Sequence, residues 1–112
     1  LDTAKQLVKK YGLKSKVKFT RGKDMADYDW VTDTINLRPS YPSVKEFLIT
    51  TLNEIRHALD RKKMGVKKYE RAYVMAGEIA VQKGGDFHDD NYFEEIAEKW
   101  GRREYQKLKN KM

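Results

Sequence analysis

The segment from Ser43 to Met64, SVKEFLITTLNEIRHALDRKKM, carries most of the information about the fold. Ser43 followed by Glu46 is a capping-box pattern, in which the serine side chain accepts a hydrogen bond from a free backbone N–H at a helix start. The apolar residues behind it keep helical spacing: Val44, Phe47, Leu48, Leu52, Ile55, Ala58 and Leu59. We therefore expect one long helix from about Ser43 to Met64, interrupted at Gly65.

A helix and a small sheet are expected before this segment. Leu7, Val8 and Tyr11 are at helical spacing and Gly12 follows them, which predicts a first helix over Asp2–Tyr11. Alternation of apolar and polar residues predicts three short strands: Lys16–Thr20, one with Tyr28 and Trp30 on one face, and Thr34–Leu37. The two prolines of the segment 38–42 end this sheet, because proline cannot extend a central ladder.

Two further helices are expected after Gly65. The first, Tyr69–Val81, should direct these residues inward: Ala72, Tyr73, Ala76, Ile79 and Ala80. Gly84 and Gly85 should end it, and an acidic loop leads to Asn91, a good N-cap. The last helix should run through Lys109 with an apolar stripe of Phe93, Ile96, Ala97, Trp100 and Leu108.

Length and composition predict one domain over residues 1–112, with an apolar fraction of 39%. Cysteine is absent, which excludes disulfide frameworks, thiolate zinc sites and cysteine nucleophiles, so a metal site must use His, Asp and Glu. There is no apolar run of roughly 18 residues and no secretory pattern in the first ten residues. We therefore expect a cytoplasmic protein with no membrane partner.

The net charge of +7 is unevenly distributed along the chain. The excess concentrates around the expected turn at Gly65, in Arg61, Lys62, Lys63, Lys67, Lys68 and Arg71. Such a patch is a candidate surface for the phosphates of a nucleic acid or for an acidic partner. The alternative is a solvated helix end, where cations suit the C-terminal dipole.

Within the long helix, the run Asn53-Glu54-Ile55-Arg56-His57 resembles the signature of the zincin metallopeptidases, His-Glu-x-x-His. In that signature two imidazoles at i and i+4 chelate one zinc, and the glutamate takes a proton from the metal-bound water. The resemblance implies that Glu54 is the general base and that His57 is a zinc ligand. Asn53 stands where the first histidine ligand belongs.

A second motif strengthens the resemblance. The run Glu94-Glu95-Ile96-Ala97-Glu98 is similar to the third-ligand helix of small zincins with a glutamate ligand, the minigluzincin, SprT-like, ImmA-like and phage-type proteins. Glu94 matches the third zinc ligand, 37 residues after His57. The resemblance implies an α+β, zincin-like fold in which the strand Thr34–Leu37 borders the cleft and pairs with the substrate. Without it, Glu54 and His57 form a polar helix face and Glu94 caps its own helix.

The asparagine at position 53 affects activity more than fold, because an amide oxygen is a poor zinc ligand beside imidazole. Three explanations stand: an introduced inactivating substitution, a natural pseudoenzyme, or a site that recruits another ligand, with His88 as the candidate. Asp60 is a candidate partner of the His57 imidazole, or else forms an ordinary helix salt bridge.

The resemblance also calls for a group beside the zinc to stabilise the oxyanion, and Tyr69, Tyr73, Tyr92 and His88 are eligible. The leading hypothesis is a zinc-dependent metallopeptidase that hydrolyses peptide bonds and is impaired by Asn53. The alternative is an inactive zincin-derived module that binds a peptide or a nucleic acid.

Overall fold

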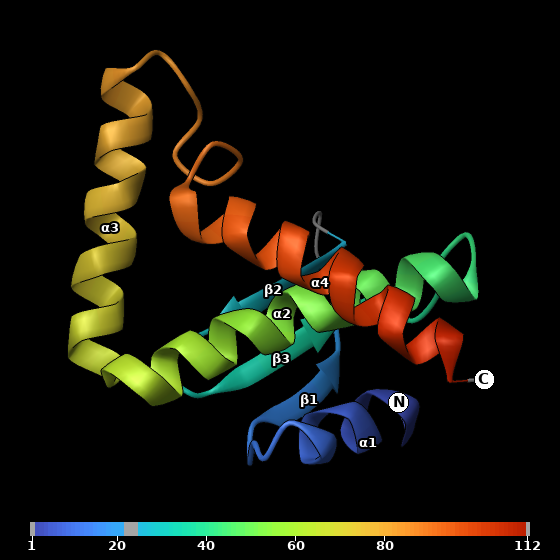
Figure 1. The fold of residues 1–112 in the computed structure, drawn as a ribbon. Coiled ribbons are helices and arrows are strands. Elements are labelled where there is room, and N and C mark those ends of the chain that lie inside the picture. Colours follow the sequence, from blue (N-terminus) through green and yellow to red (C-terminus); the bar gives the residue numbers. More distant parts are fainter. Residues whose placement is uncertain (1, 22–24, 112) are drawn as a thin grey trace.

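The computed structural model describes residues 2–21 and 25–111. Over these residues the chain is an α+β fold of four helices and a three-stranded mixed sheet, in the expected order (Figure 1). The elements are α1 Asp2–Lys10, β1 Lys16–Phe19, β2 Ala26–Asp29, β3 Thr34–Leu37, α2 Val44–Met64, α3 Val66–Gln82 and α4 Tyr92–Asn110.

The long helix α2 forms where the sequence predicts it. The Ser43 side chain accepts a hydrogen bond from the Glu46 backbone N–H at 3.1 Å, which confirms the N-cap. Gly65, with φ +89°, ends the helix in a backbone conformation that favours glycine. The next helix starts immediately, at Val66 rather than at the predicted Tyr69, because the Gly65 carbonyl already accepts from the Tyr69 N–H.

The sheet has the order β1-β3-β2, with β1 parallel and β2 antiparallel to β3. The expectation that Thr34–Leu37 borders the cleft is therefore wrong, since β3 is central and pairs on both sides. The strand at the cleft edge is β2. It ends at Asp29, before Trp30, because the Asp29 carboxylate accepts the Val31 N–H at 2.9 Å and starts a turn.

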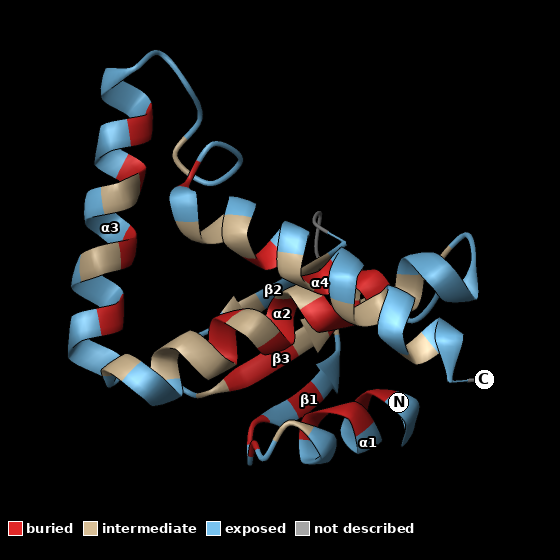
Figure 2. Cartoon of the chain, viewed as in Figure 1, coloured by how far each residue is buried: buried red, intermediate tan, exposed pale blue. Residues whose placement is uncertain are grey.

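The core lies between α1, the sheet and α2, and α4 packs along the other side of α2 (Figures 1 and 2). Its fully buried residues include Ile35, Leu37, Leu52 and Ile55. Because α2 is covered on both sides, it buries polar side chains, namely Thr51, Glu54 and His57, as well as apolar ones. Within the described residues no helix is long and apolar enough to cross a bilayer.

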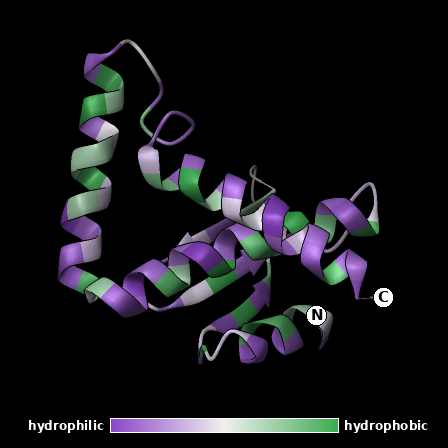
Figure 3. Cartoon of the chain, viewed as in Figure 1, coloured by the Kyte–Doolittle hydropathy of each residue, from purple (hydrophilic) through white to green (hydrophobic). Residues whose placement is uncertain are grey.

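One prediction for the third helix is wrong. The buried face of α3 consists of Tyr69, Tyr73, Gly77 and Ala80, whereas Ile79 is 46% exposed. The spacing of the buried residues places Ile79 about 120° off this face, given 100° per residue. The hydropathy colours of Figure 3 accordingly show apolar positions on α3 outside the buried face of Figure 2.

Candidate active site

A pocket of about 720 Å³ collects the residues that the two sequence motifs single out. Asn53, Glu54 and His57 enter its wall from α2, and Glu94 enters from the first turn of α4. β2 and Trp30 after it, the buried face of α3 and the loop before α4 complete the wall. Motifs separated along the chain therefore meet in one hollow.

The central contact of the pocket joins the two motifs. His57 Nε2 lies 2.9 Å from Glu94 Oε1. The imidazole is 3% exposed and the Glu94 side chain 35%, so the pair lies at the pocket wall with its carboxylate toward solvent. The separation of 37 residues shows that tertiary packing, not local sequence, brings these groups together.

The other ring nitrogen of His57 also has a partner. Tyr69 Oη lies 3.1 Å from Nδ1, and the Tyr69 side chain is only 1% exposed. Asp60 does not take this role; it accepts from Arg56 Nε at 3.1 Å, so the helix salt bridge is the correct alternative. With both nitrogens engaged, the orientation of the imidazole is fixed.

Tyr73 holds the far side of the Glu94 carboxylate. Its hydroxyl donates to Glu94 Oε2 at 2.6 Å and lies 3.0 Å from His88 Nδ1. A phenol has one proton, so while Tyr73 donates it to Glu94, the Nδ1 of His88 must carry the proton that the phenol oxygen accepts. His88 is thus exposed but tied into the network of the site.

The electrostatics of the pair follow from this geometry. Burial by itself would lower the pKa of His57, but the hydrogen bond to Glu94 and the charges of Glu54, Glu94 and Asp60 outweigh it, so the pKa is raised above 6.5. Burial would raise the pKa of Glu94, and the contacts with His57 and Tyr73 reverse this, so that pKa is lowered. Both shifts favour the ion pair.

The cap of α4 positions Glu94. Asn91 accepts the Phe93 N–H at 2.9 Å through its side-chain oxygen, which confirms the predicted N-cap. Its amide nitrogen donates to the Tyr73 backbone oxygen at 3.0 Å and so ties the start of α4 to α3. The Asn91 side chain is completely buried, so its two hydrogen bonds fix the start of α4 and place Glu94 opposite His57.

Asn53 faces α4. The amide orientation that satisfies both of its ends directs the nitrogen to the backbone oxygens of Ala97, at 2.9 Å, and Ile49, at 3.3 Å. Gly101 lies against this amide, close enough that a Cβ at position 101 would collide with it. Asn53 therefore serves the contact between α2 and α4, at the edge of the pocket.

Glu54 is 8% exposed, lies on the pocket wall and adds its charge to the environment of His57. A buried carboxylate one turn from a buried imidazole is a chemically competent proton acceptor for a molecule in the pocket.

The pocket supplies side chains suited to two of the ligand positions of one zinc ion, His57 and Glu94. Two ligands with zinc bonds of about 2.0 to 2.1 Å in tetrahedral geometry lie about 3.3 Å apart, close to the separation of His57 Nε2 and Glu94 Oε1. Tyr69 supplies the hydrogen bond that metal-bound histidines need at their second nitrogen. Asn53 does not fit as the third ligand. Across the described residues, no three His, Cys, Asp or Glu side chains form a metal-binding group.

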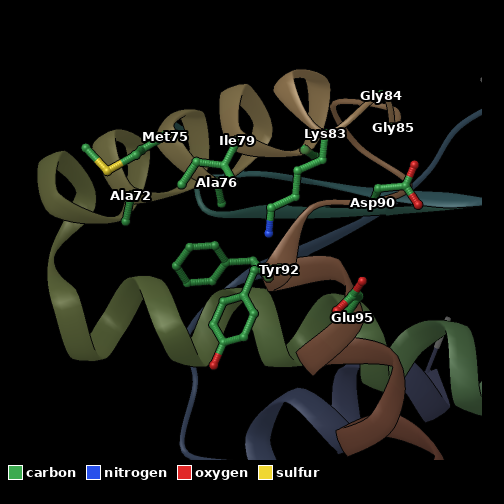
Figure 4. Close-up of a pocket in the computed structure, with 12 residues that line it drawn as sticks. Ala72, Met75, Ala76, Ile79, Lys83, Gly84, Gly85, Asp90, Tyr92 and Glu95 are labelled. Atoms are coloured by element: carbon green, nitrogen blue, oxygen red, sulfur yellow. The ribbon is translucent and has the colours of Figure 1, made fainter.

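A second pocket, of about 670 Å³, lies between α3 and the start of α4 (Figure 4). Met75 and Ile79 line it from α3, and Tyr92 lines it from α4. Tyr92 is absent from the lining of the first pocket and is 63% exposed. Among the four groups eligible to stabilise an oxyanion, Tyr92 therefore lies outside the candidate site.

Sequence reasoning did not find Trp30 as a residue of the site. Its ring lies 5.9 Å from that of Tyr69 and 5.3 Å from that of Tyr73, so it packs against both phenols that hold the pair. Arg61 Nε fixes its backbone oxygen at 2.6 Å. In the sequence Trp30 is a large aromatic residue between Asp29 and Asp33, and this pattern does not indicate which side chains Trp30 contacts in the fold.

Comparison with protein-family models, with curated proteins and with solved structures gives no match to this chain.

Proposed function

We propose that the chain is a zincin-type metallopeptidase domain in which Asn53 impairs peptide-bond hydrolysis. The observation that carries the proposal is the contact of His57 with Glu94, beside a buried Glu54. A polar helix face would leave these groups in solvent, whereas here they line one pocket and have positioned partners.

The residues of the pocket have distinct roles in this proposal. His57 and Glu94 would hold the zinc, which would supply Lewis-acid chemistry at this place in the pocket. Glu54 takes the proton from the water and delivers it to the leaving amine. Tyr73 and His88 are the remaining candidates for an oxyanion donor, and each would have to exchange its present partner, Glu94 or Tyr73, for the oxyanion. Tyr73 keeps its proton because burial and Glu94 raise its pKa.

The substrate is an extended peptide. β2 is an end strand of the described sheet, and Ala26, Asp27 and Tyr28 line the pocket. An end strand has a row of backbone N–H and C=O groups available for a further strand, which is how extended peptides bind a sheet.

A second candidate function is that of a zincin-derived module that binds the peptide without cleaving it. The hydrogen bond of Asn53 to Ala97 of α4 favours it, because the residue that should complete the zinc site is engaged elsewhere. Metal content separates the two functions. About one zinc per chain by elemental mass spectrometry supports the peptidase, and none at excess zinc supports the module.

The test of the site itself is Asn53→His, with Asn53→Gln as a control of similar size that lacks the imidazole. At a zinc concentration 100 times the Kd, binding should stabilise the histidine variant by about 2.7 kcal/mol. With an unfolding entropy of about 0.24 kcal/mol per kelvin for 112 residues, this is a rise in Tm of about 11 °C. Adding Glu54→Gln should abolish peptidase activity and keep this zinc effect. A histidine variant with no gain in zinc affinity over the control would remove the active-site assignment.

A further inference from the structure

Five lysines line one groove beside β1, at the other edge of the described sheet from β2 and the candidate active site. The groove, of about 570 Å³, lies between α1 and β1. Its cationic residues, referred to here as the lysine groove, are Lys5, Lys9, Lys14, Lys16 and Lys18. All five are exposed, and no acidic residue belongs to the lining.

Each element contributes its lysines by a simple periodicity. Lys5 and Lys9 are four residues apart on α1 and so lie on one helix face. Lys16 and Lys18 alternate with the buried Val17 on β1, which is an end strand. Figure 1 shows α1 and β1 together at one end of the molecule, away from the first turn of α4.

The charge extends beyond the groove. Lys62 Nζ, from the end of α2, donates to the Gly12 backbone oxygen at 2.7 Å, beside the loop that carries Lys14. One carboxylate, Asp33, lies beside the lining residue Ser15, and it accepts from Ser15 and Tyr28 and pairs with Arg61 at 3.8 Å, whereas five lysines belong to the lining. The groove therefore keeps its positive potential.

A concentration of like charges raises the free energy of the folded chain. A lysine on an end strand deters edge-to-edge pairing, and Lys9 suits the C-terminal dipole of α1. These effects explain separate lysines; they do not require five around one hollow. A polyanion that neutralises them together relieves the repulsion and releases its own counterions.

We propose that the lysine groove binds the phosphate backbone of duplex DNA. The lining contains no aromatic ring, so it lacks the stacking platform on which single-stranded nucleic acids depend. Its one hydroxyl, Ser15, donates to Asp33 at 2.7 Å, so no free hydroxyl in the lining is available for an RNA 2′-hydroxyl, and the lysines are suited to phosphates. Binding is therefore directed to the backbone and is independent of base sequence.

This surface differs from the basic patch that the sequence indicates around Gly65. In that patch Arg61 is bound to the Trp30 oxygen and Lys62 to the Gly12 oxygen. Lys67 and Lys68 on α3 are exposed and outside the lysine groove, so they provide a matched control.

The experiment is fluorescence anisotropy of the full chain with a labelled duplex of about 20 base pairs, over a range of salt concentrations. Five neutralised phosphates give a slope of log K against log salt of about −4.5, a loss of about 500-fold between roughly 50 and 200 mM salt. Lys16→Gln with Lys18→Gln should reduce the slope by about 1.8, and the loss over the same range to about 40-fold. Circular dichroism checks that the variants are folded.

The control, Lys67→Gln with Lys68→Gln, removes the same charge and should keep the slope of the parent chain. An equal reduction in the control would overturn the proposal, because binding would then follow net charge alone. Absence of binding at low salt, or tighter binding of single-stranded DNA or duplex RNA, would also overturn it. None of these measurements depends on zinc or on peptidase activity.

Discussion

The hydroxyl of Tyr69 offers the sharpest test of the candidate site. Tyr69→Phe removes one oxygen atom and leaves the ring in place between Trp30 and Phe93. The lost hydroxyl lies 3.1 Å from His57 Nδ1, in a side chain that is 3% exposed, so water cannot replace it readily. The variant thus isolates one buried hydrogen bond.

The cost of leaving a buried polar atom without a partner is about 1 to 3 kcal/mol. Divided by an unfolding entropy of about 0.24 kcal/mol per kelvin for 112 residues, this predicts a fall in Tm of about 4 to 13 °C. Thermal unfolding followed by circular dichroism measures it. Tyr92→Phe is the matched control, since Tyr92 is 63% exposed, and its Tm should stay within about 2 °C of the parent chain.

The same variant tests the metal role of His57. If zinc binds Nε2, the Nδ1–H must donate to Tyr69, and its loss should weaken zinc binding by about 10- to 100-fold in the Asn53→His background. A Tyr69→Phe chain with the Tm of the parent would refute the reasoning, because the imidazole would then not depend on Tyr69.

Two further predictions concern pH and helix packing. The pKa of His57 is raised in the fold, so the stability that His57 contributes is complete below about pH 6.5 and is lost as the pH rises through the folded pKa. The pKa of Glu94 is lowered in the fold, so the stability that Glu94 contributes is complete above about pH 4.5 and is lost in acid. The Tm difference between the parent and Glu94→Gln should therefore peak between these values, and a flat difference would count against the pair. Gly101→Ala gains about 1 kcal/mol of helix propensity but meets the Asn53 amide, an overpacking cost of about 1 to 3 kcal/mol. Denaturant unfolding should show that Gly101→Ala is neutral or destabilising in the parent chain. In the Asn53→Ala background the same substitution should stabilise the chain by about 1 kcal/mol. Equal changes in the free energy of unfolding in both backgrounds would contradict the contact.

The sequence was sufficient for features that depend on neighbours along the chain. The capping pattern at Ser43 and the apolar spacing behind it specify α2, because a helix is made of contacts three and four residues apart. The alternation around Val17 and Ile35 specifies short strands for the same local reason. The two motifs also singled out polar residues that line the pocket, His57 and Glu94 among them.

Strand order and the partners of polar groups were decided by the tertiary structure. Periodicity gives the face of an element but not the element that packs against it. The sequence could therefore not indicate that β3 is central, or that Tyr69 rather than Asp60 reaches the His57 imidazole.

The same limit applies to charge. A count along the chain located the basic excess near Gly65, where the basic residues are close together in sequence. Only the packing of α1 beside β1 gathers lysines from both around one groove. Likewise, Asn53 occupies a ligand position in the motif, whereas its amide is bound to α4 in the fold, since hydrogen-bond partners are set by proximity in space.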